Sequence, residues 1–168
     1  MPMCIYLDIF MGSINVNTMD VPADIVVERL IRANKQDAWR ALTEKESMLA
    51  WFFSSIPDFK PKLGFQTQFV IKPSARTFTH VWKVFAVVPY GQIAYLWHYT
   101  EYEGLAEVSF TIKEVDGNVE VAVRNRVLEP FPTEIPEFTR ESGLNGWHFF
   151  MDRLKDYLEG RPVNPLEF

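Results

Sequence analysis

One segment near the end of the chain, 144–160, constrains the fold more than any other. Its sequence, LNGWHFFMDRLKDYLEG, has the periodicity of an amphipathic helix, and Gly160 is a typical helix stop. At about 100° per residue, its large apolar side chains share an arc roughly 140° wide. They are Leu144, Trp147, Phe150, Met151, Leu154, Tyr157 and Leu158. A helix with so broad an apolar face must cover an apolar surface elsewhere in the chain.

The stretch before this helix alternates apolar and polar residues in five runs, which is typical of β-strands. The clearest run, LAEVSFTIKEV, is followed by the turn sequence DGN and then by VEVAVRNRV, so these two runs predict a hairpin. The five runs are 64–72, 76–88, 92–100, 105–115 and 119–127. Short connections join antiparallel strands, whereas parallel strands need long crossovers. We therefore predict one antiparallel sheet.

The N-terminal third adds one strand and two short helices. Residues 23–32, ADIVVERLIR, are rich in β-branched side chains and predict a strand. Residues 33–53 have helical apolar spacing, with Asn34 as the expected N-cap and a bend near Thr43. The predicted fold class is α+β: a curved antiparallel sheet of about six strands wrapped on the long C-terminal helix, with two short helices after the first strand.

The length of the chain, 168 residues, fits one domain. We assign 21–160 to this domain, 1–20 to an N-terminal extension outside the core fold, and 161–168 to a C-terminal tail. The extension contains a short apolar stretch, but Asp8 interrupts it and no basic residue precedes it. That pattern argues against a signal peptide or a membrane span. Its apolar residues would dock on the domain or on a neighbouring subunit, so a homodimer is one expectation.

Composition argues against several classes of partner. The formal charge is −5 and no Lys/Arg run stands out, so neither nucleic acid nor anionic membrane is expected. The single cysteine, Cys4, excludes an internal disulfide framework and suits a reducing, cytoplasmic setting. His80, His98 and His148 lack the spacing of metal ligands, so we expect no metal. A phosphate loop, a dinucleotide motif and a nucleophile elbow are absent from the sequence, so we expect no cofactor, and no motif indicates an enzyme.

Three motifs resemble a known family. They are AWRALTEKESMLAWF (38–52), VWKVFAVVPYGQIAYLWHY (81–99) and GWHFFMDRLKDYLEG (146–160). They are similar to the activator family for the ATPase of the ninety-kilodalton heat-shock chaperone, within the START-like, birch-pollen-allergen-like superfamily (SRPBCC). This resemblance implies a helix-grip fold in which a hydrophobic ligand often lies between helix and sheet. The chain departs from the family pattern in KPKLGFQTQF, which has one glycine where members often carry a Gly-Gly pair.

Nine residues of the predicted strands and of the C-terminal helix are candidates for lining such a cleft. They are Trp82, Tyr95, Trp97, His98, Phe110, Asn125, Gly143, Trp147 and Met151. The aromatic side chains equally suit core packing, and Asn125 equally suits a strand that leaves the core. Gly143 lies on the apolar helix arc, where it provides either close approach to the sheet or space for a ligand. We expect the mouth of the cleft at the loops 52–63, 100–104 and 128–138, which carry many aromatic residues.

Three functions follow from these expectations. The first is binding of a small hydrophobic or aromatic ligand between the helix and the sheet. The second, suggested by the family resemblance, is a protein-interaction module that acts on a heat-shock chaperone in a stress response. The third is a cyclase or lyase on the same scaffold. A panel of lipid and aromatic ligands distinguishes the first function from the second.

Overall fold

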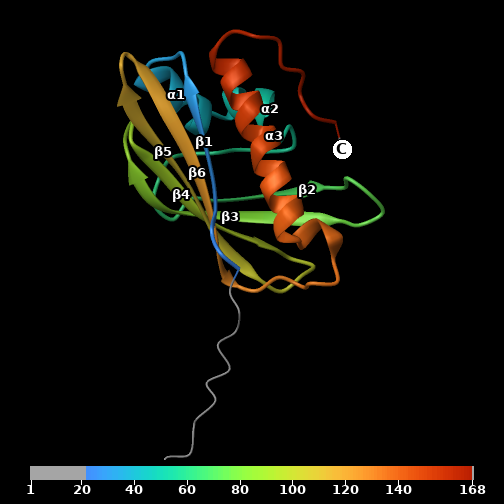
Figure 1. Ribbon diagram of the computed structural model, residues 1–168. Helices are drawn as coiled ribbons and strands as arrows, with labels where there is room; N and C mark the ends of the chain where they lie inside the picture. Colours follow the sequence, from blue (N-terminus) through green and yellow to red (C-terminus); the bar gives the residue numbers. More distant parts are fainter. Residues whose placement is uncertain (1–21, 168) are drawn as a thin grey trace, which may run out of the picture.

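One six-stranded antiparallel sheet wraps around a long C-terminal helix in the computed structural model, which describes residues 22–167 (Figure 1). The elements are β1 (Ile25–Ile31), α1 (Lys35–Thr43), α2 (Lys45–Trp51), β2 (Gln66–Ile71), β3 (Phe78–Val88), β4 (Gln92–Tyr99), β5 (Leu105–Val115), β6 (Asn118–Glu129), η1 (Pro136–Phe138) and α3 (Arg140–Leu158). The strand order is β1-β6-β5-β4-β3-β2, and every paired strand is antiparallel. The predicted α+β helix-grip architecture is confirmed. The predicted 1–20 extension lies outside the described residues.

Alternation along the strands separates a buried face of the sheet from a partly exposed one. On β5, Val108, Phe110 and Ile112 are buried, and the residues between them are partly exposed. β6 adds three buried valines to the same face. α3 lies across this buried face, and α1 and α2 lie beside its C-terminal half (Figure 1). The apolar helix arc and the apolar sheet face therefore bury each other.

Local signals set the bounds of the helices. Asn34 caps α1, because its Oδ1 accepts a hydrogen bond of 2.8 Å from the backbone N–H of Asp37. Glu44 separates α1 from α2, which confirms the predicted bend. α3 begins at Arg140, one turn before the predicted segment, because Thr139 caps it by accepting from the N–H of Ser142 at 3.3 Å.

An aromatic core fills the space between α1–α2 and the sheet. The Trp51 and Phe52 rings stack with centroids 4.7 Å apart, and Phe52 lies 5.5 Å from Trp82. Trp82 in turn stacks on Tyr95 at 4.8 Å. All four side chains are almost completely buried. This end of the molecule is therefore densely packed, and any space for a ligand must lie nearer the N-terminal half of α3.

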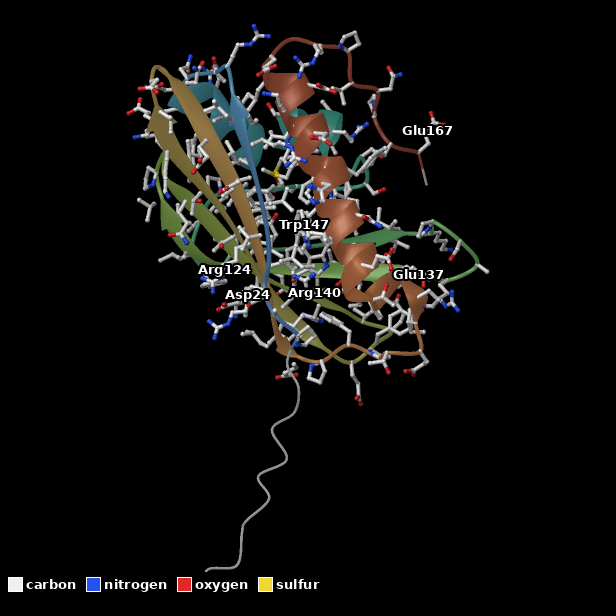
Figure 2. All side chains as sticks on the ribbon, in the orientation of Figure 1. Asp24, Arg124, Glu137, Arg140, Trp147 and Glu167 are labelled. Atoms are coloured by element: carbon white, nitrogen blue, oxygen red, sulfur yellow. The ribbon has the colours of Figure 1, made fainter. Side chains whose placement is uncertain are left out.

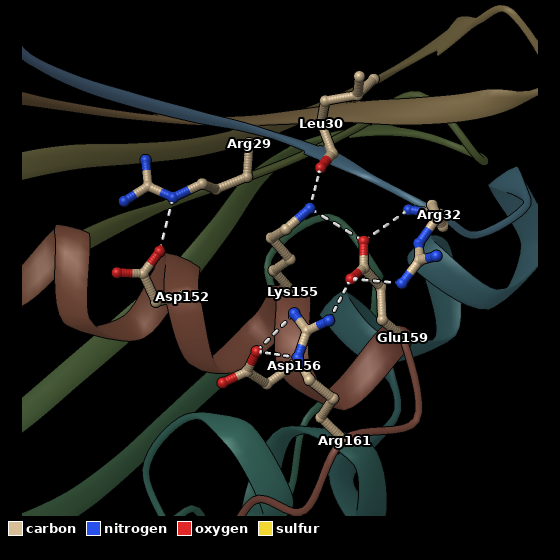
Figure 3. Close-up of polar contacts among 8 residues, drawn as sticks. All are labelled: Arg29, Leu30, Arg32, Asp152, Lys155, Asp156, Glu159 and Arg161. Carbon is tan, nitrogen blue, oxygen red and sulfur yellow. Dashed lines mark hydrogen bonds and ion pairs between the residues drawn. The ribbon is translucent and has the colours of Figure 1, made fainter.

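A cluster of charged side chains anchors the C-terminal end of α3 (Figure 3). The Glu159 carboxylate accepts from the backbone N–H of Arg32 at 3.0 Å, from Lys155 at 2.9 Å and from Arg161 at 2.5 Å. These hydrogen bonds, first that of the Arg32 backbone, lower the pKa of Glu159 to about 2. Asp152, nearer the middle of α3, pairs with Arg29 on β1 at 2.7 Å. The last turns of the helix are thus fixed to β1 and to the segment before α1.

Candidate ligand-binding cavity

A cavity of about 290 Å³ lies between the N-terminal half of α3, the buried face of the sheet and the segment that leads into α3. From α3 it is lined by Gly143, Gly146, Trp147 and Phe150, which are spaced i, i+3, i+4 and i+7 and so form one stripe. The sheet contributes Ile25, His80, Trp97, Tyr99, Ala106, Asn125 and Val127. Phe53, which follows the end of α2, also lines the cavity. At the entrance lie Pro22, Ala23, Phe131, Glu137, Phe138, Thr139 and Arg140. Figure 2 shows Trp147 between helix and sheet, with Arg140 and Glu137 toward the start of α3.

The two glycines of α3 have different surroundings. A Cβ atom on Gly143 would lie 3.1 Å from Cδ1 of Ile25, so Gly143 allows β1 to approach the helix closely. A Cβ atom on Gly146 would meet nothing within 4 Å. The sequence left open whether a glycine here allows close approach to the sheet or leaves space; Gly143 does the first and Gly146 the second. Gly146, which is not among the expected lining residues, is the glycine that faces open space.

Aromatic rings form the entrance. The Phe138 ring contacts three others, with centroids 5.1 Å from Phe131, 5.1 Å from Tyr99 and 5.2 Å from Tyr102. Phe131 rests directly on Gly104, where a Cβ atom would lie 2.3 Å from its ring; with a φ of +117°, this position requires glycine. Of the expected mouth, Phe131, Glu137 and Phe138 from 128–138 line the cavity, whereas no residue of 100–104 does; that turn contacts the 128–138 segment through Gly104 and Tyr102. From 52–63, Phe53 reaches the cavity.

A second cavity of about 280 Å³ adjoins the first. Six residues line both cavities and form the wall between them: Phe53, His80, Tyr99, Glu137, Phe138 and Phe150. The second cavity continues from this wall toward Ile71, Pro73, Phe78 and Phe149. The wall consists mainly of aromatic rings, and His80 stands in it as a polar group that touches both spaces.

His80 is enclosed by rings. Its imidazole stacks on Phe69 with centroids 4.9 Å apart and a tilt of 14°, and it lies 4.8 Å from Tyr99 and 5.0 Å from Phe53. Only 5% of the residue is exposed, and Nδ1 has no hydrogen-bond partner among the described residues. Burial lowers the pKa of His80 to about 3, and the nearby Glu101 carboxylate opposes this only in part. The ring is therefore neutral at physiological pH.

The sequence profile of one protein family, described as Activator of Hsp90 ATPase homolog 1-like protein, matches residues 32–159. The chain belongs to this family. The match runs from the segment before α1 to the end of α3, so it includes most of the cavity lining. The family resemblance of the three sequence motifs is confirmed. No curated protein matches the sequence of this family member significantly.

Solved structures share the fold of this family member. A protein from Chromobacterium violaceum has a TM-score of 0.67 and 16% identity, over 81% of this chain and 96% of that one. The Aha1 dimer from Colwellia psychrerythraea has a TM-score of 0.62 and 19% identity, over 82% and 97%. DynU16, from the dynemicin biosynthetic locus, has a TM-score of 0.68 and 20% identity over 83% of this chain, which matches 48% of DynU16. At these identities the likeness extends to the fold alone.

The structure brings four of the nine predicted site residues of this family member to the first cavity: Trp97, Asn125, Gly143 and Trp147. Trp82, Tyr95, Phe110 and Met151 lie instead in the packed core, where each is about 1% exposed or less and lines neither cavity. His98 points to the other face of β4, because it alternates with the buried Trp97. It lies opposite Val81, whereas His80 lies opposite Tyr99, so the two histidines are on opposite faces of the sheet.

Charged groups at the entrance already have partners. Arg76 pairs with Glu137 at 3.3 Å, and the Arg140 guanidinium donates to the backbone carbonyls of Ala23 and Asp24 at 3.4 and 3.3 Å. Within 22–167, no three His, Cys, Asp or Glu side chains are grouped as metal ligands would be, and no helix is long and apolar enough to cross a membrane. The lining of the first cavity consists mainly of aromatic and other apolar side chains.

Proposed function

We propose that this family member binds a small, largely apolar aromatic molecule in the cavity between α3 and the sheet. The size of the cavity supports this, since ligand sites in proteins begin at roughly 300 Å³ and the first cavity alone has about 290 Å³. The lining supports an aromatic ligand, because Trp97, Trp147 and Phe150 expose ring surface to the space. The family to which the chain belongs also supports the proposal, because its fold, a sheet wrapped around a long helix, is a ligand-binding scaffold.

The observation that carries the proposal is Gly146. A glycine inside a helix costs about 1 kcal/mol relative to alanine, and nothing around Gly146 prevents a side chain from being there. A residue that lowers helix stability without improving packing is expected where function requires the space that it leaves. A side chain at this position would project into the cavity.

Substituting Gly146 provides the test. In Gly146→Leu, the added side chain enters the cavity, whereas Asn145→Leu places the same leucine side chain at an exposed position one residue earlier. We expect the neutral fluorescent probe N-phenyl-1-naphthylamine to bind the wild type and Asn145→Leu, and to bind Gly146→Leu at least tenfold more weakly. Equal binding by all three proteins would mean that the probe, and hence the ligand, does not occupy this cavity.

Binding is a better proposal than catalysis of a lyase or cyclase type. His80 is the imidazole that lines the cavity, and with a pKa of about 3 it is a poor general base at neutral pH. The Glu137 carboxylate at the entrance is engaged by Arg76 and Ser74. These two groups suit recognition of a ligand more than proton transfer.

Interaction with a heat-shock chaperone is a second proposal, which the family description supports. Phe149 offers a contact point, because it is 48% exposed on α3 beside the Arg153 guanidinium, 5.5 Å from its ring. A pull-down of the host chaperone with wild type and Phe149→Ser tests this, with capture expected for the wild type and loss for the variant. Capture of neither protein would remove the second proposal and leave ligand binding in place. Native mass spectrometry of the same samples measures whether the protein is the expected homodimer.

A further inference from the structure

We infer that His80 determines specificity in the cavity and that the ligand is a hydroxylated aromatic molecule whose phenolic hydroxyl meets Nδ1 of this residue. The inference rests on the proposed function and deepens it by naming the ligand class. It is separable from that function, because an apolar cavity could equally bind an aromatic ligand without a hydroxyl group.

The position of His80 is the first observation that supports the inference. The residue lines both cavities, so a ligand that extends from either side contacts its imidazole ring. Nδ1 itself has almost no accessible area, so the hydroxyl meets it after the ring turns about its Cβ–Cγ bond. Nδ1 is one of four buried side-chain atoms that lack a hydrogen-bond partner in the described part of the chain. Two of the others, on Trp82 and Tyr95, belong to residues that line neither cavity. The fourth, Nε1 of Trp97, lies near the Tyr99 hydroxyl without completing hydrogen-bond geometry.

The energetic argument follows from this isolation. A buried polar atom without a partner is unfavourable, and proteins pair the great majority of such atoms. A ligand that supplies the missing partner removes this cost on binding, in addition to burying its own rings. The cavity should therefore discriminate between two aromatic molecules that differ only in one hydrogen-bonding group.

The electrostatic surroundings favour a neutral group over a carboxylate. The imidazole is uncharged at neutral pH, so it offers no cation to an anionic ligand. The Glu137 carboxylate, which lines both cavities, would repel one, and the Glu101 carboxylate, close enough to raise the pKa of His80, would add to this. Arg76 and Arg140 are already engaged at the entrance. Burying a carboxylate beside His80 would therefore be costly, whereas a hydroxyl would not.

A hydroxyl also fits the imidazole better than a ketone does. A neutral imidazole carries its proton on one of its two nitrogens. If Nδ1 is protonated it must donate, and if it is not it must accept. A hydroxyl serves in both cases because it donates and accepts, whereas a ketone serves only the first. The rings of Phe53 and Trp97, 5.0 and 5.2 Å from the imidazole, would contact the aromatic part of the ligand.

Three naphthalene derivatives test this assignment by isothermal titration calorimetry: 2-naphthol, naphthalene and 2-naphthoate. For the wild type we expect 2-naphthol to bind about tenfold more tightly than naphthalene, equivalent to about 1.4 kcal/mol, and 2-naphthoate to bind most weakly. In His80→Phe, the two neutral compounds should bind equally, with naphthalene affinity retained. His98→Phe is the matched control, because it makes the same change on the outer face of the adjacent strand, and it should keep the preference.

The possible results distinguish the inference from the proposed function. Equal affinities of 2-naphthol and naphthalene in the wild type, tightest binding of 2-naphthoate, or a preference that survives in His80→Phe each overturn the role of His80 and leave ligand binding in place. Failure of all three compounds to bind overturns both.

A measurement on the wild type avoids dependence on the folding of the variant. The ¹⁵N resonances of the imidazole rings can be assigned to His80, His98 and His148 by single substitutions of His98 and His148. Addition of 2-naphthol should shift the Nδ1 resonance of His80, while an equal concentration of naphthalene should leave it nearly unchanged. An unshifted Nδ1 resonance at saturating 2-naphthol contradicts the inference.

Discussion

Replacing Trp147 with alanine measures how firmly α3 is held on the sheet. The side chain is 4% exposed, and its ring lies 5.8 Å from Trp97 and 5.9 Å from Phe110. Deletion of a large buried aromatic side chain costs about 3–5 kcal/mol. Since one side of Trp147 already borders the cavity, fewer contacts are lost than at a fully packed site, and we expect about 3 kcal/mol, near the lower limit.

Urea unfolding followed by far-ultraviolet circular dichroism is the assay, because tryptophan fluorescence changes with the substitution itself. Phe110→Ala is the comparison: this residue is 1% exposed and lines neither cavity, so its loss should cost about 4 kcal/mol. In a domain of this size, 3 kcal/mol lowers Tm by roughly 6–12 °C. A loss below about 1 kcal/mol for Trp147→Ala would show that this face of α3 does not cover the sheet.

Three further predictions concern stability. Gly146→Ala should raise the free energy of unfolding by up to about 1 kcal/mol, because the added methyl group meets no atom. Gly143→Leu should lower the free energy of unfolding, because the side chain would press on β1. Urea unfolding of both variants measures these changes. Glu159 has a folded-state pKa of about 2 against a usual 4.5, so its contribution to stability is complete above pH 4.5 and is lost as the pH falls toward 2. Glu159→Gln should therefore cost about 1–2 kcal/mol at pH 7 and flatten this part of the dependence of stability on pH. His80 is held neutral, with a pKa of about 3 against 6.5, so the unfolded chain binds more protons between these values and stability should fall as the pH drops below about 6.5; a fall of equal size in His80→Phe would contradict this assignment.

The fold could be predicted because its signals are local. Strict alternation in 105–115 and 119–127 indicated two strands, and the DGN turn between them indicated that they pair. The apolar arc of the C-terminal segment required a partner surface, and the one apolar face of the sheet met that requirement. The N-terminal bound of α3 was missed because the helical periodicity is weak before Gly143 and the cap at Thr139 follows a proline-rich segment.

The site could be predicted only in part, because the sequence does not indicate which positions of a strand lie in the packed core and which lie beside the cavity. Tyr95 and Trp97 share a face and are both aromatic, yet Tyr95 packs against Phe59 at 5.8 Å and Trp97 lines the cavity. Which of them a ligand can reach depends on where α3 diverges from the sheet, a tertiary property. His98 does not line the cavity, because its alternation with the buried Trp97 places it on the outer face of β4.

His80 lines the cavity but is not among the residues that the sequence argument expects there. Its signal was its register: it precedes Trp82 by two positions on a strand, so the two share the inner face. That register would have placed a histidine among aromatic residues, where an unpaired ring nitrogen is unusual. The missing information was the pairing with β4, which puts His80 beside Tyr99 at the cavity.

The most direct test of ligand binding in the cavity is a crystal structure of the protein soaked with 2-naphthol. We predict electron density for the naphthalene rings between Gly146 and the sheet, against Trp97 and Trp147, with the hydroxyl oxygen within about 3 Å of Nδ1 of His80. Density for the compound only on the outer surface of the protein, with side chains filling the space between α3 and the sheet, would contradict the account.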